Sequence, residues 1–241
     1  MKQFLIFFLK LGLIIYWSSI MNNFIAYSQS NLPTGFVDVQ EVIPSILVDL
    51  KYLGSDNFVG RPIPGYNTSR VILSKEATSA LANVQTELQQ FGLSLLIYDA
   101  YRPTQAVDAF VDWLNEPEDK TIKQKYYPTL TKKEIFEQQY IMKKSSHSRG
   151  STVDLTIVSL NNTQNQNSIF YTPLDMGGIF DFFGKESHPD FQSITPQQKA
   201  NRLLLRTIMT KYGFTPLSNE WWHFTLVNEP FPETYFNFPI E

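Results

Sequence analysis

The sequence contains no cysteine and only three histidines in its 241 residues. Without cysteine the chain can form no disulfide and offers no thiol nucleophile, so any metal site must use histidine and carboxylate ligands. It also lacks a basic run, and its net charge of −3 argues against a nucleic-acid partner. Neither an internal repeat nor an HExxH motif occurs, which excludes repeat architectures and the helical zinc-protease pattern.

The first 28 residues have the features of an export signal. Lys2 precedes a long apolar run, and Ala26 and Ser28 supply the small side chains that signal peptidase requires. We therefore expect residues 1–28 to be a signal peptide and residues 29–241 to be an exported domain, periplasmic or extracellular. An uncleaved membrane anchor is the alternative. After cleavage no stable membrane association is expected.

The remaining chain has the composition of one packed domain, with 43% apolar and 15% aromatic residues overall. The mixed order of its periodic segments predicts an α+β fold, with a central, mostly antiparallel sheet flanked by helices. Capping residues and periodicity predict helices after Ser74, after Thr104, at 132–140 and after Thr195, and strands at 42–50, 93–98, 151–158 and 221–227.

Two of the three histidines stand beside other reactive side chains. His147 precedes the strand at 151–158, and Asp154 projects from that strand's polar face because alternate residues share a face. Glu220 and His223 lie three residues apart at the start of a later strand. Catalytic zinc commonly has three protein ligands, an open position for water and a carboxylate base nearby. His147, Asp154 and His223 supply that number of ligands, and Glu220 remains as the base.

Strand geometry adds a condition, because residues three apart on a regular strand point to opposite faces. If His223 faces a metal from a strand, Glu220 must lie in the preceding turn or bulge. Each residue taken alone has a structural explanation, since a single histidine or strand aspartate is more often a surface or packing residue. The combination favours a metal site.

Several motifs together resemble those of the zinc peptidases that include D-Ala-D-Ala carboxypeptidases and dipeptidases, whose fold is shared by Hedgehog-type domains. The chain is most similar to the D-Ala-D-Ala dipeptidases of the vancomycin-resistance type. The motifs run in the same order from about residue 40 to the C-terminus: Asp49-Leu-Lys-Tyr52, Asp56-Asn57-Phe58-x-Gly60, Tyr98-Asp99-Ala-Tyr101-Arg102-Pro103, Ser145-x-His147-x-x-Gly150-x-x-x-Asp154, Asp175-Met176-Gly177, Phe180-Asp181, Ser187-His188 and Glu220-Trp-Trp-His223.

The resemblance implies a role for each site residue. It implies one zinc ion per chain, bound by His147, Asp154 and His223, which activates the water that attacks D-Ala-D-Ala. Glu220 is then the general base and later the general acid, and Arg102 stabilises the oxyanion. Asp181 would pair with the free amino group of the substrate, and Tyr52 and Ser145 would line the dipeptide pocket. Thr152-Val153 departs from the Ala-Ile pair expected before the metal aspartate.

Three other interpretations stay open at this point. The first is a D,D- or L,D-carboxypeptidase or endopeptidase that trims peptidoglycan stem peptides. Asp181 favours the dipeptidase, because a carboxylate that binds a free amino group requires a dipeptide. The second is a non-catalytic, zinc-stabilised binding module, which the presence of Glu220 and Arg102 disfavours. The third is a soluble domain in which the motifs coincide by chance. The oligomeric state and the biological role are not predicted.

Overall fold

The computed structural model describes residues 32–161 and 170–241, and the residues from Gly35 to Glu241 form one structural unit. The predicted signal peptide at 1–28 lies outside the described residues. Within the described ranges, no helix is long and apolar enough to cross a bilayer.

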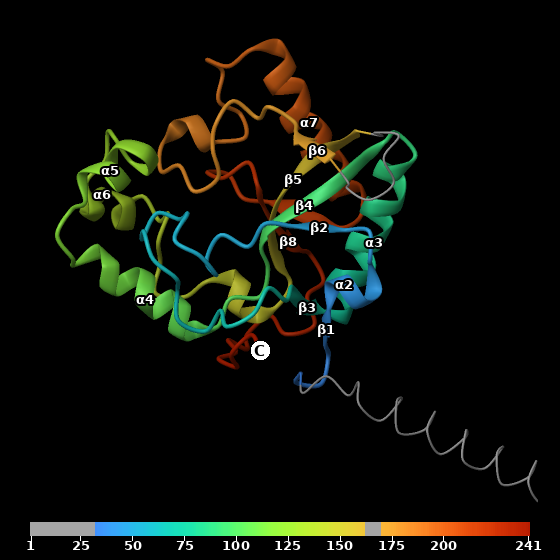
Figure 1. Cartoon of the computed structure of the whole chain (residues 1–241), viewed down its shortest axis with the longest axis horizontal. Helices are drawn as coiled ribbons and strands as arrows, with labels where there is room; N and C mark the ends of the chain where they lie inside the picture. The colour runs from blue at the N-terminus through green and yellow to red at the C-terminus, as the bar shows by residue number, and fades with distance from the viewer. Residues whose placement is uncertain (1–31, 162–169) are drawn as a thin grey trace, which may run out of the picture. The chain divides into compact units, whose positions relative to one another are not determined.

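The main sheet has the strand order β2-β4-β5-β8-β7 (Figure 1). Its centre is the antiparallel pair β4 (Leu93–Asp99) and β5 (Thr152–Asn161). β8 (His223–Leu226) pairs with the first residues of β5, and β6 (Phe170–Pro173) pairs with the last ones. β5 is long enough to pair with β8 at its start and with β6 at its end, and it also pairs with β4, so three strands of the sheet contact it.

The other strands are short. β7 (Phe214–Pro216) pairs with β8 in the antiparallel sense, whereas β2 (Leu47–Val48) runs parallel to β4. β1 (Phe36–Asp38) and β3 (Ile72–Ser74) form a separate antiparallel pair. The predicted α+β fold with a mostly antiparallel sheet is confirmed.

Helices flank the sheet. α3 contacts β4 and α7, whereas α4, α5 and α6 lie together on the left of the sheet in Figure 1. The helices are α2 (Val39–Val42), α3 (Lys75–Gln89), α4 (Thr104–Leu114), α5 (Lys120–Tyr126), α6 (Lys132–Glu137) and α7 (Pro196–Lys211), with 3-10 turns η2 (Ser146–Arg149) and η3 (Lys185–Ser187).

Capping residues explain where the two long helices begin. Ser74 accepts a hydrogen bond from the amide of Ala77 before α3, and Thr195 forms a capping box with Gln198 before α7, as predicted. The predicted cap of α4 is wrong: Pro103 is its N-cap, and Thr104 is already helical. The predicted strand at 42–50 is also too long, because its first residue belongs to α2 and only Leu47–Val48 pair.

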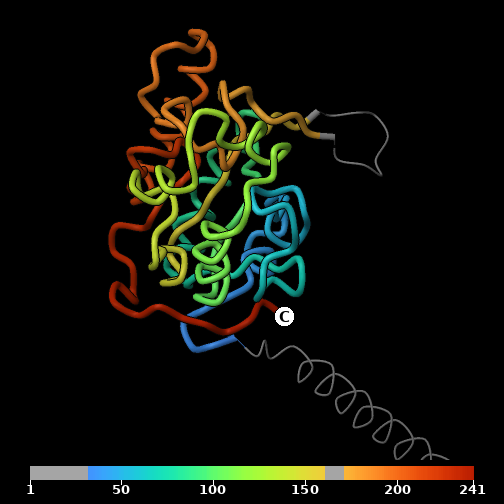
Figure 2. The backbone as a smooth tube through the Cα atoms, turned by 90° about the vertical axis from the view of Figure 1, so that its left-hand side faces the viewer, coloured from blue at the N-terminus to red at the C-terminus, as the bar shows by residue number. Residues whose placement is uncertain are grey.

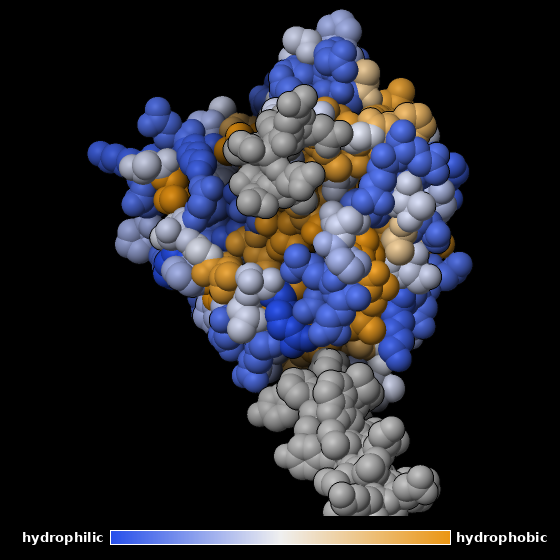
Figure 3. Space-filling model, turned by 45° about the vertical axis from the view of Figure 1, so that its right-hand side comes forward, coloured by the Kyte–Doolittle hydropathy of each residue, from blue (hydrophilic) through white to orange (hydrophobic). Residues whose placement is uncertain are grey.

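Apolar side chains of β5 and of α3 both belong to the buried core. Val153, Leu155 and Ile157 are fully buried on one face of β5, and Leu81 and Leu88 of α3 are buried as well. Some large apolar side chains remain on the surface, and Figure 3 shows apolar residues gathered across the middle of one face between hydrophilic ones.

The C-terminal segment, red in Figure 2, runs along the lower edge of the main body. Ile240 forms a bridge with Tyr66, and the Tyr101 hydroxyl donates a 3.0 Å hydrogen bond to the carbonyl of Phe238. The side chain of Asn237 accepts a hydrogen bond from the amide of Gln105 in the first turn of α4. These contacts fix the loop between β4 and α4, which carries Arg102.

Candidate active site and metal centre

A tight turn before β5 places His147 at the site. The Ser145 hydroxyl caps this turn by accepting a hydrogen bond from the amide of His147, and Gly150 ends it with φ of 80°. A Cβ atom at position 150 would overlap the ring of Phe36, so only glycine fits. This packing explains why serine, histidine and glycine occur at these spacings.

The protonation of His147 follows from its neighbours. Its Nδ1 lies 2.6 Å from the carbonyl oxygen of Ala100, which can only accept a hydrogen bond. Nδ1 therefore donates a hydrogen bond to this carbonyl, and Nε2 faces the site. Such a backbone contact is the usual support of a metal-binding histidine.

The structure brings the three predicted ligands together. His147 Nε2 lies 3.3 Å from His223 Nδ1 and 3.2 Å from Asp154 Oδ2, and His223 Nδ1 lies 3.1 Å from Asp154 Oδ1. The sheet register produces this cluster, because Asp154 of β5 and His223 of β8 are directly opposite partners. One ligand atom from each residue lies within 4.8 Å of the others, and all three residues are buried.

These distances fit one cation between the three side chains. Ligands of tetrahedral zinc, each about 2.0–2.2 Å from the ion, stand about 3.3–3.6 Å from one another. Burial lowers the pKa of His223, so its ring is neutral near pH 7 despite Asp154 beside it. Asp154 Oδ1 is buried and accepts no hydrogen bond among the described residues. A carboxylate oxygen and two imidazole nitrogens that face one another at this range form a ligand set that can hold a cation.

Two opposing effects act on the Asp154 carboxyl. Burial alone would raise its pKa, but His147 and His223 beside it hold that pKa well below the usual range. Asp154 is therefore ionised, which is the form that binds a metal ion.

Glu220 lies in the turn before β8, as strand geometry predicted. The amide of His223 bonds to the carbonyl of Glu220 across this turn, and Glu220 Oε2 lies 3.5 Å from His223 Nδ1. Burial, with Asp154 and Asp181 nearby, raises the pKa of Glu220 well above its ordinary value. The carboxyl is thus placed and tuned to exchange a proton beside the ligand cluster.

Arg102 approaches the cluster from the end of β4. Its Nε donates a 2.9 Å hydrogen bond to the buried carboxylate of Asp99, and its Nη2 lies 3.5 Å from Asp154 Oδ2. The guanidinium also lies 5.1 Å from the ring centroids of Tyr52 and Phe110. Arg102 is thereby held with its charge next to the metal ligands.

Asp181 closes the site on another side. Both of its carboxylate oxygens lie within reach of the Tyr52 hydroxyl, at 3.1 and 3.0 Å. Its backbone has φ of 61°, a left-handed conformation that is uncommon for a residue with a side chain. Burial is the main cause that raises the pKa of Asp181 well above its ordinary range, and Asp154 adds to it.

All eight residues singled out in the sequence line one cavity of about 610 Å³. The sequence did not assign two further residues that belong here. Asp99 anchors Arg102 and lies 3.6 Å from His147 Nδ1. Tyr140 lines the cavity, and its hydroxyl is 3.0 Å from His188 Nε2. The position of Asp99 at the end of a buried strand was a usable signal, whereas nothing near Tyr140 in the sequence marks it.

A comparison of the chain with known protein families identifies its family. The family model described as D-ala-D-ala dipeptidase, of the Peptidase_M15 group, matches residues 33–241. The chain belongs to this D-Ala-D-Ala dipeptidase family.

Curated relatives are similar in sequence to this chain over most of their length. The chain is 39% identical over 209 residues to a D-alanyl-D-alanine dipeptidase of Enterococcus faecalis, covering 87% of this chain and 100% of the relative. It is 40% identical over 205 residues to the D-alanyl-D-alanine dipeptidase of Streptomyces coelicolor, covering 85% and 98%. The Escherichia coli enzyme of the same name is 37% identical over 193 residues, covering 80% and 85%.

Solved structures similar to this chain include two vancomycin-resistance peptidases. A mutant of the D,D-pentapeptidase VanY in complex with Zn(II) has a TM-score of 0.38 and 14% identity, covering 69% of this chain and 78% of that one. The D,D-dipeptidase VanXYg, in complex with a phosphinate analogue of D-Ala-D-Ala, has a TM-score of 0.34 and 17% identity, covering 70% and 56%.

Proposed function

We propose that this protein hydrolyses the dipeptide D-Ala-D-Ala to two molecules of D-alanine and binds one zinc ion through His147, Asp154 and His223. The observation that supports this most directly is the convergence of three ligand atoms within 4.8 Å beside a carboxyl group at 3.5 Å. Relatives named for this activity, identical at 37–40%, support the substrate.

The residues of the chain divide the reaction between them. A bound zinc ion supplies Lewis acidity for amide hydrolysis. Glu220 accepts a proton from the attacking water at its carboxylate and returns it to the leaving amine nitrogen. Arg102 stabilises the negative charge that develops on the substrate carbonyl oxygen, because its guanidinium is fixed by Asp99 before the reaction begins.

Asp181 and Tyr52 give the site its preference for a free amino group. A buried carboxylate binds an ammonium group well, and a blocked amino group would leave it without a cation. Ser145 contributes to the cavity wall and holds the turn that carries His147. Nearby Lys143 and Lys144 line the same cavity and can receive the carboxylate of the dipeptide.

A turnover assay on free D-Ala-D-Ala tests the proposal, with protein that begins at Gln29 and with and without a chelator. We expect D-alanine release that the chelator abolishes and added zinc restores. The N-acetylated dipeptide separates the proposal from the trimming of stem peptides, because preference for the blocked substrate would replace the dipeptidase with a carboxypeptidase. We also propose export of the protein, which fractionation of the producing cell would check.

A further inference from the structure

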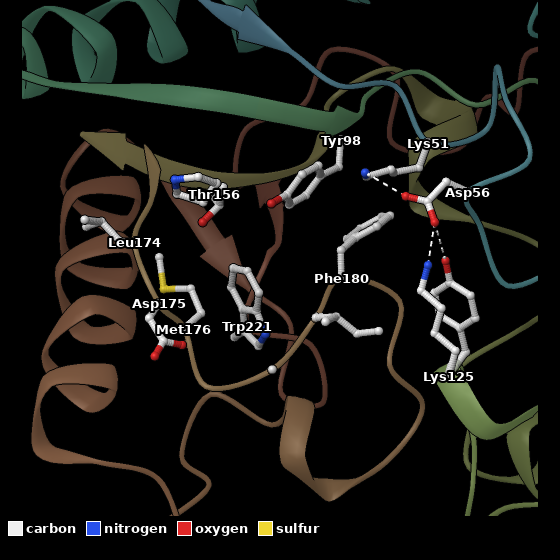
Figure 4. Close-up of a pocket in the computed structure, with 14 residues that line it drawn as sticks. Lys51, Asp56, Tyr98, Lys125, Thr156, Leu174, Asp175, Met176, Phe180 and Trp221 are labelled. Atoms are coloured by element: carbon white, nitrogen blue, oxygen red, sulfur yellow. Dashed lines mark hydrogen bonds and ion pairs between the residues drawn. The ribbon is translucent and has the colours of Figure 1, made fainter. Parts of the chain in front are cut away.

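A second cavity, of about 340 Å³ (Figure 4), shares no lining residue with the cavity at the metal centre. We call it the Trp221 pocket. Thr156 in its wall follows the metal ligand Asp154 by two positions on β5, so both side chains belong to the same face of the sheet. The two side chains are therefore separated by about 7 Å along the strand.

Two buried polar atoms belong to this wall and have no hydrogen-bond partner among the described residues: Thr156 Oγ1 and Trp221 Nε1. The two residues are 1% and 5% exposed. Trp221 Nε1 is close to the pocket lining, because a Cβ atom at Gly178 would lie 3.9 Å from it. Buried polar groups are almost always paired, so two unpaired ones at one cavity point to a ligand that pairs with them.

The remaining surface of the pocket defines the chemistry of that ligand. The rings of Tyr98 and Phe180 stand 4.8 Å apart at their centroids, and Leu174 and Met176 add aliphatic surface. Figure 4 shows these side chains around the hollow together with Trp221. A ligand with an apolar body fits such walls.

The charged residues that line the pocket are Lys51, Lys125, Asp56 and Asp175. Both lysines form ion pairs with Asp56. Asp49 also pairs with Lys51. Asp56 is 65% exposed, so it can turn toward water and leave the Lys125 ammonium group to a ligand, whereas Lys51 stays paired with Asp49. The indole N–H and the ammonium groups can only donate hydrogen bonds, so the ligand must bring acceptors.

We propose that the Trp221 pocket is a second binding site, which takes a small amphipathic carboxylate and alters dipeptide binding at the metal centre. Two residues of the pocket wall are neighbours in sequence of active-site residues. Phe180 precedes Asp181, and Trp221 follows Glu220. Phe180 lines the Trp221 pocket and Asp181 lines the cavity at the metal centre, so consecutive side chains enter different cavities. A ligand that moves the Phe180 or Trp221 ring therefore moves the substrate-binding carboxylate or the base.

The binding can be tested with 4-phenylbutyrate as the probe, by calorimetry on the zinc-loaded protein. The dipeptide site is kept saturated with a phosphinate analogue of D-Ala-D-Ala, so that the probe carboxylate cannot bind the metal. We expect saturable binding of one equivalent. Loss of all binding once the analogue is present would place the probe in the active site and overturn the proposal.

Matched variants locate the probe. Thr156→Val removes a hydroxyl that has no partner in the described part of the free protein, so we expect unchanged thermal stability and about tenfold weaker binding. Leu174→Trp fills the pocket and should abolish binding. Thr152→Val on the same strand removes a hydroxyl that bonds to Thr225, so it should lower stability and leave binding intact. Equal probe affinity in all three variants would refute the site.

The effect on the active site is a separate readout, and it rests on the proposed function. Saturating 4-phenylbutyrate should change the KM for D-Ala-D-Ala at least about threefold. By linkage, the probe and the phosphinate analogue should change each other's Kd by one and the same factor. Binding without any change in KM or kcat would overturn the regulatory part. Failure of the protein to cleave D-Ala-D-Ala would overturn the proposed function, and the probe affinities of Thr156→Val and Leu174→Trp, measured without the analogue, would still test the pocket.

Discussion

The Tyr52 hydroxyl lies 3.0 Å from one carboxylate oxygen of Asp181 and 3.1 Å from the other, although the two residues are 129 positions apart. Tyr52 comes from the loop after β2, and Asp181 from the loop between β6 and η3. Aromatic rings hold the tyrosine in place, with Phe110 at 5.0 Å and Tyr66 at 5.6 Å between centroids. The carboxylate that we propose to bind the amino group is therefore fixed by a buried tyrosine as well as by its own loop.

Replacing this carboxylate by its amide isolates its charge. We expect Asp181→Asn to lower kcat/KM for D-Ala-D-Ala by about 100-fold, mainly through KM, because the substrate ammonium loses a buried ionic partner. Activity on the N-acetylated dipeptide should change little. Steady-state kinetics on both substrates measure the ratio. Tyr52→Phe is the control and should lower kcat/KM less, since the Asp181 carboxylate remains. An unchanged KM in Asp181→Asn would contradict the proposed role of Asp181.

Glu220 can be tested without disturbing the metal ligands. Glu220→Gln keeps the shape of the side chain and removes its capacity to accept a proton, so we expect kcat to fall by at least about 100-fold. Zinc content, measured by elemental analysis, should stay at one ion per chain. Near-normal turnover by a zinc-loaded Glu220→Gln protein would show that another group moves the proton.

Removal of the metal should weaken the fold as well as the activity. Without a cation, two imidazoles and a buried aspartate face one another at 3.1–3.3 Å. At a zinc concentration about 1,000-fold above Kd, binding to the native state contributes about 4 kcal/mol to stability. We therefore expect a chelator to lower Tm, as followed by calorimetry, and His147→Ala to abolish zinc binding. The third histidine provides the control, because His188→Ala should keep the metal; zinc retention by His147→Ala would contradict the ligand set.

The loop that carries Tyr52 depends on one buried amide side chain. Asn57 donates hydrogen bonds to the carbonyls of Lys51, Gly54 and Arg61 and accepts them from the amides of Val59 and Gly60. It is 1% exposed, so its loss leaves backbone groups unpaired.

We expect Asn57→Ala to lower the free energy of unfolding by about 3 kcal/mol, as measured by urea denaturation. Asn67 lies in the same loop region with an exposed side chain, so Asn67→Ala should change stability by less than about 0.5 kcal/mol. Equal stability of the two variants would show that water replaces the hydrogen bonds of the Asn57 side chain without loss of stability.

Local patterns predicted the parts of the fold that depend on local physics. The alternation at 151–158 predicted β5 and the face that carries Asp154, and the spacing of Glu220 and His223 predicted a turn before β8. Thr104 was assigned as the cap because threonine is a good N-cap, but the N-cap is Pro103 and the helix starts at Thr104. The C-terminal segment replaces a side-chain cap, because Phe236 O and Asn237 Oδ1 accept hydrogen bonds from the amides of Thr104 and Gln105.

Long-range pairing was beyond those patterns. No periodicity shows that Asp154 lies opposite His223 or that Asp181 meets Tyr52, because sheet register and loop contacts depend on the whole chain. The resemblance to zinc peptidases provided the site residues that spacing could not. The Trp221 pocket had no signal in the sequence, since its walls come from separate segments whose proximity only the fold creates.

The contacts of residues 237–240 with Tyr101, Gln105 and Tyr66 have a practical consequence for handling the protein. Proteolytic trimming of these few residues would release the segment that presents the guanidinium, although no atom of the reaction centre would be removed. A preparation nicked near its carboxyl end would then keep its metal and most of its helices while losing turnover, so intact mass should be verified before any low rate is attributed to the chemistry.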